Sequence, residues 1–245
     1  EKYKLYGELI NVYGYNLEEG AKELLAPNFY DNNKEIRIPL DPTLSPQENS
    51  QKFFDRYGKL KRTAEALDKL LQETKAEIDH LESIQNSLDI ALSADDLVQI
   101  KQELTEYGFI KKNRSGKKEK IKSKPFHYLS SDGYDIYVGK NNYQNDELTF
   151  KFATGNDWWF HAKGMPGSHV IVKSKGEEMP DRVFEEAGML AGFYSKGRDS
   201  DKIEIDYLQK KNVKKPAGSA PGFVVYYTNY SLTIHPDISH LKLIE

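Results

Sequence analysis

The chain has 245 residues, enough to bury a core as one large domain or as two modest ones. It contains no cysteine, which excludes disulfides, thiolate metal sites and a cysteine nucleophile. Residues 1–110 hold 13 Lys and Arg against 21 Asp and Glu, whereas residues 111–245 hold 22 against 17. This charge asymmetry suggests two modules, of which the second could face a polyanion.

Residues 1–15 carry apolar side chains at helical spacing, and the predicted helix ends near Gly14. No apolar run approaches the roughly 20 residues that cross a bilayer, and the N-terminal stretch is not a signal peptide. The chain starts in the middle of a helical pattern, so we expect it to be a fragment of a longer protein. Residues 16–44 contain an Asp-Asn-Asn turn, an alternating segment at 35–40 and several prolines, which predicts a small β tip.

A long helix is predicted to follow the tip. Ser45 and Pro46 form a start signal, Glu48 completes a capping box, and no proline occurs until after Ala91. The apolar stripe along this helix needs a partner helix, but the first helix is long enough to cover only about a third of it. We therefore predict a coiled-coil arm over residues 1–110, with a short return helix at 94–107. The uncovered stretch Leu67–Leu88 suggests a homodimer.

Residues 111–124 contain eight basic residues in fourteen. They are expected to form a solvated linker, a tether that contacts nucleic acid through its charge, or both.

Residues 125–245 have the pattern of an α+β module with a mostly antiparallel sheet and one main helix. The helix is expected at Arg182–Lys196, capped by Asp181, with Gly188 and Gly192 allowing a close approach to the sheet. Strands are expected at 134–142, 146–153, 157–161, 168–173, 202–207, 222–227 and 232–236.

The segment NDWWFHAKGMPGSHVIVK, residues 156–173, raises the question of function because it contains both tryptophans of the chain beside two histidines. Strand alternation places Trp158 and Phe160 on one face, and Asp157, Trp159 and His161 on the other. Asp157, His161 and His169 would be an acceptable but weakly spaced metal set. Ser168 with a histidine and Asp157 would suit a hydrolase, but Ser168 is not in a nucleophile elbow.

Polymer recognition is the third interpretation of this hairpin. Lys163 and Lys173 flank it, and residues 209–222 add Lys and Asn side chains on a loop. Basic groups would hold phosphates while exposed aromatic rings stack on bases. Under this interpretation Trp158 and Phe160 are core residues, whereas Trp159, His161 and the loop are exposed.

The segments 130–173 and 190–229 resemble the NFACT-R domain of the NFACT family, and residues 1–110 resemble the coiled-coil arm of that family. The resemblance covers nearly the whole chain, with 111–124 as the linker and 125–245 as the NFACT-R domain. The signature residues are Asp157, Trp158, Phe160, Pro166, Gly167 and Ser168. We expect contact with an RNA or protein partner at Trp159, His161, Lys163, His169, Lys173, Asn212, Lys214 and Lys215.

The resemblance implies a binding protein with no catalytic residues, no metal and no cofactor. Family members bind tRNA and stalled large ribosomal subunits in ribosome quality control, and streptococcal members are described as anchorless fibronectin-binding adhesins. We therefore expect fibronectin, tRNA and the large ribosomal subunit as partners, in the cytoplasm with anchorless display at the cell surface. The alternative is an intracellular RNA-binding module whose fibronectin binding is incidental to charge.

Overall fold

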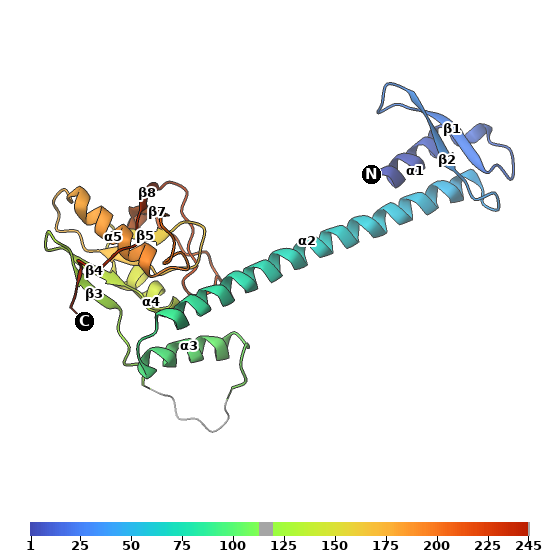
Figure 1. The fold of residues 1–245 in the computed structure, drawn as a ribbon. Helices are drawn as coiled ribbons and strands as arrows, with labels where there is room; N and C mark the ends of the chain where they lie inside the picture. Colours follow the sequence, from blue (N-terminus) through green and yellow to red (C-terminus); the bar gives the residue numbers. More distant parts are fainter. Residues whose placement is uncertain (113–119, 245) are drawn as a thin grey trace. The chain divides into compact units, whose positions relative to one another are not determined.

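The computed structural model describes residues 1–112 and 120–244 (Figure 1). Contacts between residues divide the chain into two compact units, residues 1–75 and residues 76–245. The division lies inside the long helix, because the C-terminal part of that helix packs with the sheet module. Half of the basic linker predicted at 111–124 falls on residues 113–119, outside the described residues.

The first unit is a helix and a β-hairpin packed around a small apolar core. Its elements are α1 (Lys2–Tyr13), the short turn η1 (Gly14–Asn16), β1 (Glu23–Asn28), β2 (Lys34–Pro39) and the first part of α2 (Pro46–Ile90). β1 and β2 pair antiparallel. Asn32 and Asn33 adopt positive φ angles of 47° and 56° in the connection 29–33 between them, a backbone region that asparagine tolerates better than most residues. The predicted helix and β tip are confirmed.

α2 begins at the predicted capping box. The backbone N–H of Ser45 donates to Glu48 Oε2 at 2.8 Å, and the N–H of Glu48 donates to Ser45 Oγ at 3.3 Å. Further along, Leu67, Leu70 and Leu71 are more than half exposed, so the predicted apolar stripe lacks a cover here. None of the helices in the described part of the chain has the length and apolar character of a membrane span.

The second unit contains a seven-stranded antiparallel sheet within residues 120–244, in the order β8-β7-β5-β6-β4-β3-β9. The predicted α+β class is confirmed. The strands are β3 (Phe126–Leu129), β4 (Asp135–Val138), β5 (Trp158–Ala162), β6 (Val170–Val172), β7 (Ile203–Gln209), β8 (Tyr230–Ile234) and β9 (Lys242–Leu243). The helices and turns are α3 (Ala94–Glu106), α4 (Asn142–Glu147), the π-helical turn η2 (Leu148–Phe152), α5 (Asp181–Phe193) and η3 (Lys210–Asn212).

Three sequence predictions for this unit are wrong. Residues 146–153 form the end of α4 and the π-helical turn η2 instead of a strand, because Asn141 caps a helix by accepting from the N–H of Gln144 at 3.0 Å. Residues 222–227 form no strand and make a single bridge, between Val225 and Lys214. Asp181 is the first residue of α5 and not its cap, since the N-cap is Pro180.

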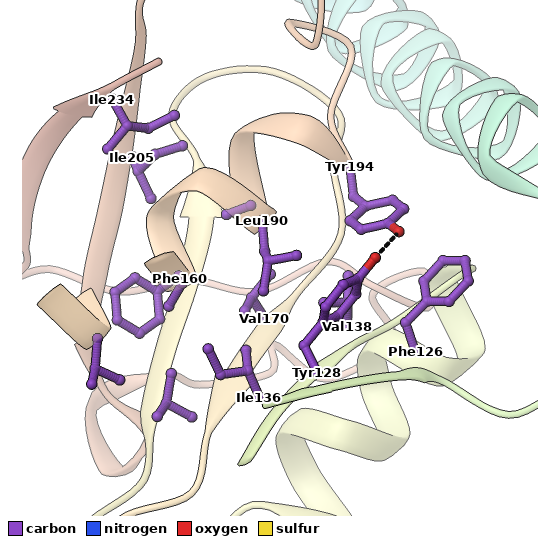
Figure 2. Packing of buried hydrophobic residues seen from close by; sticks show 14 of the residues in the cluster. Phe126, Tyr128, Ile136, Val138, Phe160, Val170, Leu190, Tyr194, Ile205 and Ile234 are labelled. Carbon is purple, nitrogen blue, oxygen red and sulfur yellow. Dashed lines mark hydrogen bonds between the residues drawn. The ribbon is translucent and has the colours of Figure 1, made fainter. Parts of the chain in front are cut away.

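α5 covers one face of the sheet (Figure 1). Leu190 of α5 packs on fully buried sheet side chains such as Phe160 and Val170 (Figure 2). The Tyr128 and Tyr194 hydroxyls share a hydrogen bond of 2.7 Å at the edge of this core. A Cβ added at Gly192 would lie 2.7 Å from the Ile234 side chain, and one at Gly188 would lie 2.9 Å from Leu232. The predicted close approach at these two glycines is confirmed.

The opposite face of the sheet is also covered. Trp159, Ile171 and Leu208 pack there against Leu148 of the π-helical turn and Val213 of the loop after β7. The sheet is therefore buried on both sides near β5.

A buried polar network joins α3 and the end of α2 to the sheet module. The Gln99 side-chain oxygen accepts hydrogen bonds of 3.0 Å from Asn141 and from Gln144. Glu103 is fully buried and accepts from Asn142 at 2.9 Å, with His80 Nε2 at 2.7 Å from the same oxygen. Burial raises the pKa of Glu103 against the opposing effect of these hydrogen bonds.

Candidate nucleic-acid interface

The β5–β6 hairpin sends alternate side chains to the two covered faces of the sheet. Trp158 pairs with Val172 and Phe160 with Val170, and both aromatic residues face α5. Phe160 is fully buried, whereas Trp158 is only partly buried, with its ring 4.9 Å from that of Phe184. The predicted alternation is confirmed, and burial is complete for Phe160 alone.

Trp159 and His169 are not exposed as the polymer-binding interpretation expected. Trp159 is 0% exposed and His169 is 1% exposed. His169 Nδ1 lies 2.8 Å from the Thr149 hydroxyl, and the Trp159 ring packs against Tyr226 at 5.3 Å. The expected exposure is wrong because residues 148–152 and 213–226 cover this face, so neither side chain can touch a partner in this arrangement.

His161 is partly buried and stacks on Trp159, with ring centroids 5.6 Å apart. Burial lowers the pKa of His161. The pKa of His169 is lowered further, by its own burial and by its neighbour His161. Both rings are therefore neutral at pH 7 and serve as packing groups between the sheet and its cover.

Asp157 is a structural anchor. Its carboxylate accepts from Lys173 Nζ at 2.5 Å, from the N–H of Ser174 at 2.9 Å and from the N–H of Thr154 at 2.7 Å. These bonds occupy both carboxylate oxygens, which argues against the metal and hydrolase interpretations. Ser168 is 1% exposed, and no group of three metal-binding side chains occurs among the described residues.

A basic and aromatic surface surrounds the end of β5 at which Asp157 lies. Lys210 Nζ lies 5.6 Å from the centroid of the Phe150 ring, and Lys173 Nζ lies 4.8 Å from that of Phe152. The backbone N–H of Lys211 donates to Gly155 at 3.2 Å, which holds the loop after β7 beside the π-helical turn. We call this surface the lysine face; it comprises Phe150, Lys151, Phe152, Lys173, Lys210, Lys211, Asn212, Lys214 and Lys215.

Four of the predicted contact residues belong to the lysine face: Lys173, Asn212, Lys214 and Lys215. Lys163 does not, because it follows Ala162 at the opposite end of β5 and pairs with Glu204 at 2.6 Å. Five residues at about 3.3 Å each separate the two ends of this strand. The site predicted from the sequence therefore combined side chains from both ends of the hairpin, which lie apart in the structure.

Asp146 ties the loop that carries Lys214 and Lys215 to α4. Its carboxylate accepts from Lys215 Nζ at 2.6 Å and from the N–H of Gly222 at 2.9 Å. Lys214 is exposed, and within residues 1–112 and 120–244 it makes only backbone hydrogen bonds, to Val225 at 3.0 and 2.9 Å. Lys214 therefore offers a free charge, whereas the charge of Lys215 is partly committed to positioning the loop.

Comparison with known families gives two matches that together cover residues 1–227. Residues 1–123 match a model described as NFACT N-terminal and middle domains, and residues 124–227 match the NFACT protein RNA binding domain. The chain belongs to the NFACT family. The resemblance predicted from the sequence is confirmed, and the whole lysine face lies in the part that matches the RNA-binding domain of NFACT proteins.

Named relatives agree with this membership. The Rqc2 homolog RqcH of Streptococcus pneumoniae is 40% identical over 238 residues, which cover 97% of this chain and 42% of that protein. The ribosome quality control complex subunit NEMF homolog of Drosophila melanogaster is 24% identical over 200 residues, 78% of this chain and 18% of that protein. This NFACT chain thus spans less than half the length of these relatives.

A solved structure is also similar. The C-terminal part of the fibronectin/fibrinogen-binding protein of Streptococcus suis matches with a TM-score of 0.74 and 40% identity, over 81% of this chain and 80% of that one.

Sequence reasoning missed three residues of this NFACT surface, Phe150, Lys151 and Phe152, and included Lys210 and Lys211 only as part of the basic loop 209–222. A strand at 146–153 would have sent Lys151 to the face opposite Phe150 and Phe152. In the π-helical turn all three line the same region of the surface. The signal that could have found them is Asn141, a helix cap placed two residues after a strand-ending glycine.

Proposed function

We propose that the lysine face holds the phosphate backbone of a structured RNA, tRNA or the RNA of the large ribosomal subunit, in ribosome quality control. The observation that carries this proposal is the position of six lysines around two aromatic rings, inside the part that matches the NFACT RNA-binding domain. Lysines neutralise phosphates and release counterions, while rings such as the 41% exposed Phe152 stack on unpaired bases. The role is binding, not catalysis.

The test is binding of labelled deacylated tRNA to the chain across a salt series. We expect saturable binding whose affinity falls steeply between about 0.05 and 0.3 M salt, because counterion release dominates it. A weak or salt-independent interaction would contradict the proposal.

Fibronectin binding is a second candidate, favoured by the free edge of the sheet and by the name of the similar Streptococcus suis protein. Within the described residues β8 pairs only with β7, and Tyr230 on β8 is 63% exposed. An uncharged edge strand can accept an extended segment of a partner by strand addition. Binding to immobilised fibronectin that survives about 0.3 M salt would support this role, since charge attraction is screened there.

The two candidates differ in where the protein would act. RNA binding places it with ribosomes in the cytoplasm, and fibronectin binding requires anchorless display at the cell surface. If fibronectin binding is lost in salt while tRNA binding remains, the module is an RNA binder and the adhesin role is incidental to charge.

We also propose a homodimer through the leucine stripe of α2, because Leu67, Leu70 and Leu71 are exposed on one helix. Sedimentation velocity at tens of micromolar protein is expected to show a dimer that Leu67→Glu/Leu71→Glu converts to a monomer. Glu65→Lys, at an exposed position on the opposite side of the same helix, should leave the dimer intact. A wild-type monomer at the highest attainable concentration would contradict this proposal.

A further inference from the structure

A groove of about 350 Å³ lies beside the lysine face, between α3 and the α4–η2 segment. Gln99 of α3 and Tyr143 of α4 line it, together with Phe150 of the π-helical turn. Lys151 and Lys215, both members of the lysine face, also line it. An RNA strand whose phosphates lie on the lysine face would therefore pass the mouth of this groove.

Gln99 gives the groove a fixed hydrogen-bond donor. The residue is 7% exposed, and its side-chain oxygen accepts hydrogen bonds from Asn141 and Gln144, both at 3.0 Å. These two bonds fix which end of the amide is the oxygen. Its Nε2 makes no hydrogen bond within the described part of the chain and belongs to a side chain that lines the groove. An amide nitrogen so placed is suited to donate to a ligand oxygen.

The groove also contains an acceptor and two ring surfaces. Glu147 is exposed, and its carboxylate has no partner among residues 1–112 and 120–244. The Tyr143 hydroxyl donates to Glu106, which fixes the ring. Phe150 supplies a second ring, with Lys210 above it. Donor, acceptor and aromatic surface are the three elements by which proteins recognise an unpaired base.

We propose that this groove takes one unpaired guanine of the bound RNA. The Gln99 amide would donate to guanine O6, and the Glu147 carboxylate would accept from guanine N1–H and the N2 amino group. Adenine has an amino group at the position of guanine O6. In the groove this amino group would lie opposite the amide donor of Gln99, and two donors cannot form a hydrogen bond with each other. This inference rests on the proposed RNA function and adds base selectivity to it.

The test uses the 245-residue chain and labelled oligocytidylates of about twelve nucleotides that carry one central guanine, adenine or uracil. Cytosine is the background because its edge matches the groove poorly. We expect the guanine oligomer to bind on the order of tenfold more tightly than the adenine oligomer, within the range for a bidentate base contact. The uracil oligomer should fall between them, since uracil can accept from Gln99 at O4 and donate to Glu147 from N3–H, but presents the acceptor O2 where guanine has its N2 amino group.

Two variants locate the selectivity. Glu147→Gln changes an exposed side chain and should reduce the preference for guanine to about twofold or less. Gln99→Glu keeps an oxygen for Asn141 and Gln144 and removes the donor, so it should also abolish the preference. Glu185→Gln, an exposed carboxylate on α5, is the matched control and should keep it. Circular dichroism verifies that each variant is folded.

Equal binding of the guanine and adenine oligomers would overturn the base site while leaving the RNA surface intact. A guanine preference that both variants retain would place the selectivity elsewhere and also overturn it. If no oligomer and no tRNA binds at low salt, the proposed RNA function itself fails, which is a different result from equal binding.

Discussion

Replacing Lys151, Lys211 and Lys214 together with alanine is expected to weaken tRNA binding roughly 100-fold near 0.1 M salt. All three side chains are exposed on the lysine face and have no ion-pair partner among the described residues. Each alanine substitution removes one phosphate contact, so the magnitude of the slope of log K against log salt should decrease by about 2–3. Fluorescence anisotropy with labelled tRNA over a salt series measures both quantities.

Lys215 is left out of this variant because it holds Asp146 and the loop, and its loss would mix binding with folding. The matched control removes three other exposed lysines: Lys163 and Lys202, at the opposite ends of β5 and β7, and Lys242, on the edge strand β9 three strands from β6. Lys202 precedes β7, whereas Lys211 follows it. The control should bind tRNA within about twofold of the wild type, with an unchanged slope. If both triple variants lose affinity equally, binding depends on total charge and the lysine face is not the site.

The arm and the sheet strands with strict alternation could be predicted from the sequence because their signals are local. The capping box at Ser45 and the period-2 pattern of β5 each specify one local conformation. The segment at 146–153 could not be predicted in this way. Its alternating pattern is typical of a strand, but the cap at Asn141 and the tertiary packing of Leu148 turn it into helix.

The candidate site was only partly predictable for the same reason. Alternation placed Trp159 on the face opposite Phe160, and this was correct. Whether that face is open depends on what packs over it, and the cover consists of a π-helical turn and a loop distant in sequence. Burial of Trp159 is therefore a tertiary property. The loop lysines were found because clustered charge is evident in the sequence, whereas Lys151 on the misassigned segment was not.

The aromatic and histidine hairpin positions the lysine face without forming part of it. Trp159 and His169 fill the space between the sheet and the segments that carry the lysines. Asp157 fixes the same segments at their ends, since its backbone oxygen also accepts from the N–H of Lys210 at 2.8 Å. A change at Asp157 should therefore affect folding first and binding as a consequence.

Asp157→Asn is expected to lower the free energy of unfolding of the second unit by about 2–4 kcal/mol at pH 7. The carboxylate is 1% exposed and accepts from Lys173, Ser174 and Thr154. Asparagine has one oxygen and one amino group, so one of these donors would face another donor. Urea unfolding followed by tryptophan fluorescence measures the change, because the only two tryptophans, Trp158 and Trp159, both lie in this unit.

The stabilisation by the Asp157 carboxylate should decrease as the pH falls. Burial alone would raise the pKa of Asp157, but the hydrogen bonds from Lys173, Ser174 and Thr154 outweigh it and hold the pKa below its ordinary value of 3.8. The carboxylate therefore stabilises the fold above about pH 4, and this contribution is lost as the pH falls from there through the folded pKa. The difference in the free energy of unfolding between the wild type and Asp157→Asn should therefore decrease on acidification over that pH range. As a control, Asp199→Asn, at an exposed site, should keep its free energy of unfolding within about 0.5 kcal/mol of the wild-type value. If the difference in stability caused by Asp157→Asn is constant from pH 7 to pH 3, the charge of Asp157 does not anchor the loops.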